Sequence, residues 1–138
     1  MTAIDRRALL ALSATAALGY TPARAATPEQ RRFVDAAFAM KRDAERAGDQ
    51  SYGAVVVRHD AIVGWGPSRV IVNRDASAHA EREAIRDAQK RLGGDLSGCV
   101  MYSTSRPCAA CETAAAEANI ERMFFGADAR DAGPPRRG

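Results

Sequence analysis

The sequence has no internal repeats, no internal linker and no apolar run long enough to span a bilayer comfortably. The apolar stretch over residues 8–19 is shorter than the roughly 20 apolar residues that a membrane-spanning helix needs. We therefore expect no permanent membrane span. Setting aside residues 1–25, for the reasons given below, leaves 113 of the 138 residues, enough for one domain with one core.

Beyond the N-terminal segment, the chain has little net positive charge. The chain carries a formal net charge of +3, and residues 1–25, with three arginines and one aspartate, account for +2 of it, which leaves +1 for the rest. Nucleic-acid binding needs a clustered basic patch on the folded domain, and the pair Arg136-Arg137 does not supply one. We therefore expect no nucleic-acid partner.

The first 25 residues have the pattern of an export signal. Arg6-Arg7 precedes the apolar stretch, and Ala23-Arg24-Ala25 forms a small-x-small cleavage site. We expect cleavage after Ala25 and a periplasmic protein. The paired arginines favour the twin-arginine route, although Asp5 stands where such signals usually carry Ser or Thr. A Sec signal and a fortuitous apolar N-terminus are the alternatives.

Cysteine and histidine are few, and each falls into a different sequence context. Cys99 lies in an apolar run and is expected to be a buried strand residue. Cys108 and Cys111 form a C-x-x-C pair, which we expect to bind a metal ion, so we expect no disulfide. His59 falls in a tight turn between two strands, which leaves His79 as the candidate histidine ligand.

The segments His79-Ala80-Glu81 and Pro107-Cys108-Ala109-Ala110-Cys111 carry the chemistry of the chain. One imidazole and two thiolates bind Zn²⁺ and leave its fourth tetrahedral position open, which is typical of a catalytic site. H-x-E with P-C-x-x-C is the signature of zinc nucleobase deaminases, in which the glutamate is an acid and base and not a ligand. Zinc lowers the pKa of bound water to about 7, and Glu81 would carry a proton from that water to the ring nitrogen and the departing amine. The alternative for the C-x-x-C pair is a redox or structural site.

Both halves of this site are predicted at helix N-termini. An apolar stripe at helical spacing follows His79 and stops at Gly93-Gly94, with Ser77 as a candidate N-cap. Pro107 suits the first position of a second helix, on which the two cysteines at i and i+3 share one face. The alanines of residues 109–118 would let this helix pack closely beside the first.

Helices and strands alternate along the chain. Thr27-Pro28-Glu29-Gln30 fits a capping box that opens an amphipathic helix. Strands are expected at residues 53–58, 61–65, 99–103 and 122–126. This alternation predicts a three-layer α/β/α domain with a mixed central sheet over residues 26–131. Residues 132–138, rich in Pro, Gly and Arg, are expected to form a mobile tail.

From about Phe33 to Asp131 the chain resembles the cytidine and deoxycytidylate deaminase superfamily. Bacterial guanine deaminases and tRNA adenosine deaminases are the most similar members. The likeness rests on Asn73, Ser77-Ala78-His79-Ala80-Glu81, residues 96–102, Pro107-Cys108-Ala109-Ala110-Cys111 and Phe125-Gly126-Ala127. It implies a cytidine-deaminase-like fold, a zinc ion on His79, Cys108 and Cys111, and Glu81 as the catalytic acid and base.

The same resemblance implies a substrate pocket. Asn73 would hydrogen-bond the base or sugar, and Gly53, Ala54 and Ala80 would line the pocket. The alternative for Asn73 is a turn residue in Asn73-Arg74-Asp75.

Two departures from the family pattern bear on the substrate. Arg106 stands where these enzymes usually carry Glu directly before the Pro-Cys pair. By the same resemblance, we also expect residues 127–138 not to supply the C-terminal helical segment that helps close the pocket in relatives. We therefore expect a homodimer, in which a second subunit helps to wall the pocket.

The function expected from these features is zinc-dependent hydrolytic deamination of a free nucleobase or nucleoside, with a purine such as guanine favoured and ammonia released. One alternative is a tRNA adenosine deaminase, against which export and the low net charge argue. Another is a non-catalytic, zinc-stabilised module with a deaminase-like fold.

Overall fold

The computed structural model describes residues 25–138. The order of its elements confirms the predicted alternation and adds one short final strand. The elements are α2 (Pro28–Arg46), β1 (Gly53–Arg58), β2 (Ala61–Pro67), α3 (Ala80–Leu92), β3 (Cys99–Ser103), α4 (Ala109–Glu117), β4 (Arg122–Phe125) and β5 (Arg130–Gly133).

The strands form one mixed sheet in the order β2-β1-β3-β4-β5. Strand β1 is antiparallel to both β2 and β3, β3 is parallel to β4, and β4 is antiparallel to β5. The β1–β2 connection is the tight turn expected at His59 and Asp60, which both adopt positive φ, of 47° and 63°, as the favoured two-residue hairpin turns require.

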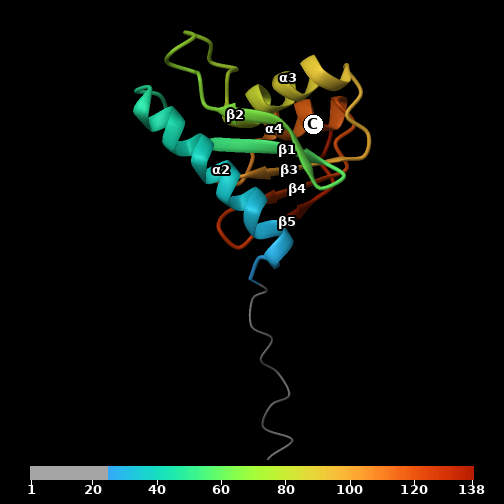
Figure 1. Ribbon diagram of the computed structural model, residues 1–138. Helices are drawn as coiled ribbons and strands as arrows, with labels where there is room; N and C mark the ends of the chain where they lie inside the picture. Colours follow the sequence, from blue (N-terminus) through green and yellow to red (C-terminus); the bar gives the residue numbers. More distant parts are fainter. Residues whose placement is uncertain (1–24) are drawn as a thin grey trace, which may run out of the picture.

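Helices cover both faces of the sheet, which confirms the three-layer α/β/α prediction (Figure 1). Because side chains alternate along a strand, Val55 and Val57 of β1 join the core beneath α2. Ala54 and Val56 join the core that α3 and α4 form on the other face. The alanine-rich α4 contributes Ala115 to that core. The two metal-binding motifs therefore lie on one side of the sheet.

The capping box predicted for α2 is confirmed. The Thr27 side chain accepts a hydrogen bond from the Gln30 backbone, and the Gln30 side chain accepts one from the Thr27 backbone. Two other helix-start predictions are wrong. His79, not Ser77, is the N-cap of α3, because Asp75 binds the Ser77 hydroxyl. Cys108 is the N-cap of α4, so Pro107 lies one residue before the N-cap and not at the first position of the helix.

The C-terminal residues form contacts in the structure that the sequence pattern does not indicate. Strand β5 includes the first two residues of the expected tail, and Asp131 in it pairs with Arg122 of β4. The backbone N–H of Gly138 donates to the Thr113 hydroxyl at 3.3 Å, so the end of the tail contacts α4. The strand escaped prediction because Arg130–Gly133 has no alternation of apolar and polar residues.

Among residues 25–138, no helix has both the length and the apolar character needed to cross a membrane. The apolar stretch at residues 8–19 lies outside the described residues.

Candidate metal centre and its cavity

The N-termini of α3 and α4 bring three ligand side chains together. The Nδ1 atom of His79 lies 3.7 Å from the Sγ atom of Cys108 and 3.4 Å from the Sγ atom of Cys111. One ligand atom from each of the three residues lies within 4.8 Å of the others. The C-x-x-C spacing puts Cys108 at the N-cap and Cys111 in the first turn of α4, where the helix N-terminus favours negatively charged thiolates.

This donor set fits zinc. One imidazole and two thiolates are ligands that Zn²⁺ prefers, and three protein ligands leave room for water or substrate. Burial raises the pKa of the Cys111 thiol, and the neighbouring Glu81 and Cys108 raise it further. Zinc would reverse this effect, since a coordinating thiol loses its proton.

Glu81 lies beside the ligands without belonging to the group of three. Its side chain is buried, and its Oε2 atom lies 3.5 Å from the Sγ atom of Cys111. Burial raises the pKa of the Glu81 carboxyl; its own backbone N–H, Cys111 and His79 act in the opposite direction and only partly offset the burial. The structure therefore places a buried carboxyl group next to the candidate metal position.

A cavity of about 160 Å³ opens over these residues. Its lining joins the start of α3, the loop before α4 and the segment before β1. The lining residues are Gln50, Tyr52, His79, Ala80, Glu81, Ser105, Arg106 and Cys108.

The four residues expected to bind substrate are not all at this cavity. Ala80 lines it. Gly53 and Ala54 are buried in β1, and Gly53 packs so closely on α2 that a Cβ atom would lie 2.2 Å from the Ala37 carbonyl oxygen. Asn73 is exposed in a turn, where its backbone N–H donates to the Arg69 carbonyl at 2.9 Å. The contacts predicted for Gly53, Ala54 and Asn73 are thus not formed by the lining of this cavity.

Three lining residues were missed by sequence reasoning: Gln50, Tyr52 and Ser105. Gln50 and Tyr52 come just before the predicted strand at residue 53, and Ser105 comes just before the Arg106-Pro107 pair. None of the three belongs to a motif of its own. The sequence signal that could have identified them as lining residues is that each lies next to a segment already recognised.

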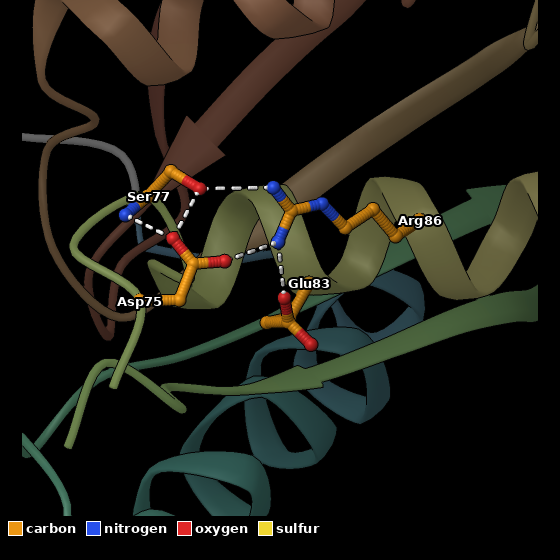
Figure 2. A network of polar contacts seen from close by, with 4 residues as sticks. All are labelled: Asp75, Ser77, Glu83 and Arg86. Atoms are coloured by element: carbon orange, nitrogen blue, oxygen red, sulfur yellow. Dashed lines mark hydrogen bonds and ion pairs between the residues drawn. The ribbon is translucent and has the colours of Figure 1, made fainter. Parts of the chain in front are cut away.

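A polar network fixes the loop that leads into α3 (Figure 2). The Asp75 carboxylate accepts hydrogen bonds from the backbone N–H and the hydroxyl of Ser77, at 2.8 and 2.7 Å. Arg86, one and a half turns along α3, donates to the Ser77 hydroxyl at 3.0 Å and to Glu83 at 2.7 Å. The network therefore holds the residues just before His79 against their own helix.

A buried carboxylate anchors the other end of this loop. Asp49 accepts hydrogen bonds from the Ser68 hydroxyl at 2.9 Å and from the backbone N–H groups of Ile71 and Val72 at 3.0 and 2.8 Å. Burial alone would raise the pKa of Asp49, but these bonds and one from the Gln50 backbone outweigh burial and lower it. Asp49 thus ties the segment that carries Gln50 and Tyr52 to the loop that carries Asn73.

Comparison with known proteins gives a consistent result. The model of the cytidine and deoxycytidylate deaminase zinc-binding region matches residues 27–127. Guanine deaminase of Bacillus subtilis is 39% identical over 82 residues, which cover 59% of this chain and 53% of that protein. The tRNA-specific adenosine deaminase of Buchnera aphidicola is 35% identical over 96 residues, covering 69% of this chain and 59% of that protein.

A solved structure from work on A-to-I editing by tRNA:A34 deaminases at the wobble position of transfer RNA superimposes with a TM-score of 0.67. It is 32% identical, and the match covers 69% of this chain and 70% of that one. The chain itself spans little more than half of the length of the curated relatives named above.

The expectation of a signal peptide, export and a periplasmic location is contradicted by these relatives. Several are named as tRNA-specific adenosine deaminases, and transfer RNA is used where proteins are made, inside the cell. The pattern that suggested export lies in residues 1–24 and Ala25, almost wholly outside the described residues. The error arose because a short apolar stretch behind two arginines matches a targeting signal by composition alone.

Proposed function

The chain belongs to the cytidine and deoxycytidylate deaminase family, and on that premise we propose that it deaminates a nucleobase hydrolytically at the cavity over His79, Cys108 and Cys111. Zinc is the cofactor of this family, and when bound it supplies a Lewis acid that lowers the pKa of water to about 7. The reaction breaks the bond between a ring carbon and its exocyclic amine and releases ammonia.

Each residue at the cavity has a distinct task in this proposal. His79, Cys108 and Cys111 hold the metal. Glu81 removes a proton from the attacking water and delivers protons to the ring nitrogen and to the departing amine, as a general acid and base. The observation that carries the proposal is the position of the Glu81 carboxyl, which lines the cavity, lies 3.5 Å from a ligand thiol and is kept from solvent.

A free purine base or its nucleoside is the substrate that we favour. The relative named guanine deaminase supports a purine. Tyr52 lines the cavity and is 46% exposed as a residue, so it is a candidate for stacking on a base, and Gln50 offers both a donor and an acceptor.

Adenosine within transfer RNA is the second candidate. It is favoured by the relatives named for tRNA and by the superposition with the tRNA:A34 deaminase structure. The low net charge of the chain no longer argues decisively against it, because these relatives are named for a nucleic-acid substrate.

The direct test is release of ammonia by the zinc-loaded protein. Bases, nucleosides and a short RNA hairpin carrying an unpaired adenosine would be compared at equal concentration. Turnover of guanine or guanosine but not of the hairpin supports the favoured substrate, and the reverse supports the second candidate. No turnover of any amino-bearing base would instead support a non-catalytic zinc module.

A further inference from the structure

Arg106 combines two features that the proposed reaction does not use. It lines the cavity beside Cys108, and its side chain is exposed. Its guanidinium carbon lies 5.5 Å from the centroid of the Phe125 ring at the end of β4, and the next residue, Pro107, is buried. The backbone and the aromatic contact thus fix a cation at the mouth of the cavity.

In the part of the chain that the structure describes, the Arg106 guanidinium makes no hydrogen bond to another residue and contacts the Phe125 ring. Within residues 25–138, no carboxylate lies at ion-pair distance from Arg106, whereas Arg86, Arg91 and Arg122 are each paired with an acidic residue. An arginine has five N–H donors and no acceptor. Stacking on a ring face leaves these donors at the edge of the guanidinium plane, where a planar or tetrahedral oxygen group can meet them.

The charges around the cavity narrow the kind of group that Arg106 can bind. Glu81 is the other formally charged residue among the lining residues, and it is buried at the metal position. A guanidinium only donates, so it binds acceptors; carbonyl and ring-nitrogen acceptors of a base are neutral, whereas a phosphate accepts two parallel hydrogen bonds and also carries the opposite charge. Arg106 is exposed and Glu81 is buried, and both line the same cavity, so a ligand in this cavity has Arg106 as its solvent-accessible charged neighbour.

We propose that Arg106 is a specificity-determining residue that binds the phosphate of a nucleotide substrate. The inference rests on the proposed function, because it takes the base to be bound at Glu81. It extends the favoured purine substrate from the free base or nucleoside to the nucleotide, so that a nucleoside 5′-monophosphate binds more tightly than the matching nucleoside or free base.

Equilibrium binding separates this inference from catalysis. Titration calorimetry of the zinc-loaded protein would compare guanosine with its 5′-monophosphate, and adenosine with its own. We expect the monophosphate to bind about tenfold or more tightly, as charge-assisted hydrogen bonds provide, and the preference to weaken as salt is raised. In Arg106→Gln the preference for the monophosphate should fall to about twofold or less. Arg106→Lys should keep part of it, because lysine has the positive charge but cannot donate two parallel hydrogen bonds as a guanidinium does.

Arg42→Gln is the matched control. Arg42 is exposed on α2, which covers the opposite face of the sheet, so this variant should bind all four ligands like the wild type. Equal binding of nucleoside and monophosphate by the wild type, or an undiminished preference in Arg106→Gln, would overturn the proposal.

Two further measurements, ammonia release and binding of the RNA hairpin, distinguish the remaining outcomes. A phosphate preference in binding without deamination of any ligand would overturn the proposed function and leave the role of Arg106 standing. In a further outcome, Arg106→Gln would lose binding of the RNA hairpin but not of the monophosphates. That result would overturn the proposal of a mononucleotide ligand and assign the Arg106 contact to the RNA backbone.

Discussion

Gly66 of β2 lies directly beneath Ala80, the first residue of α3. A Cβ atom at Gly66 would lie 2.1 Å from the Ala80 carbonyl oxygen and 2.4 Å from the Ala84 backbone nitrogen. The first turn of α3 can therefore rest on the sheet only because residue 66 has no side chain. That turn carries Glu81 and follows directly from His79, so the site depends on this close contact.

Replacing Gly66 with alanine should push α3 away from β2. We expect the free energy of unfolding to fall by about 1–3 kcal/mol, as for other overpacked sites, and the zinc content per chain to fall with it. Gly94→Ala is the control, since nothing lies within 4 Å of a Cβ atom there. Urea unfolding and metal analysis of both variants check this, and two variants of equal stability would show that α3 tolerates the shift.

Replacing Asp49 with asparagine should loosen the loop between β2 and α3 in a pH-dependent way. The asparagine amide cannot accept all of the hydrogen bonds that Asp49 receives, and leaving buried donors unpaired costs about 1–3 kcal/mol. The folded-state pKa of Asp49 is below the ordinary value of 3.8, so its stabilisation is present above that value and is lost as the pH falls through the lower one.

The measurement is urea unfolding of wild type and Asp49→Asn from pH 7 downward. The difference between them should be constant at neutral pH and shrink as the pH falls below about 4. A difference that is as large at the lowest pH as at pH 7 would mean that the ionised carboxylate is not what holds the loop.

Replacing either Cys108 or Cys111 with serine should remove zinc from the purified protein. A hydroxyl remains protonated near neutral pH and is a poor zinc ligand, so we expect well under half of the wild-type zinc per chain in each variant. Cys99→Ala serves as the control, because Cys99 is fully buried in β3 and outside the ligand group. It should lose stability and keep its zinc. Full occupancy in both serine variants would refute the ligand assignment.

The metal-binding motifs could be predicted because their spacing is local. The C-x-x-C pair at a helix start and the H-x-E segment are short patterns in which few residues fix the geometry, and the structure brings His79, Cys108 and Cys111 together. The capping box at Thr27 is local in the same sense.

Features that depend on distant contacts could not be predicted. The role of Asp49 becomes visible only when Ser68, 19 residues later, lies against it. Strand β5 has no strand pattern of its own and forms because β4 offers it an edge. The role of Asn73 in substrate binding stays a prediction; the structure places it in an exposed turn outside the lining of the cavity. A homodimer stays a prediction.

The central claim is that Glu81 carries the proton in a hydrolytic deamination, and Glu81→Gln tests it most directly. With the substrate that the wild type turns over best, ammonia release and zinc content would be measured together. Glu83→Gln is the control, because Glu83 lies on the same helix and pairs with Arg86 outside the cavity lining. We expect Glu81→Gln to keep its zinc and lose about 10² to 10⁴ in rate, with Glu83→Gln close to wild type. Turnover by Glu81→Gln at the wild-type rate would contradict the mechanism.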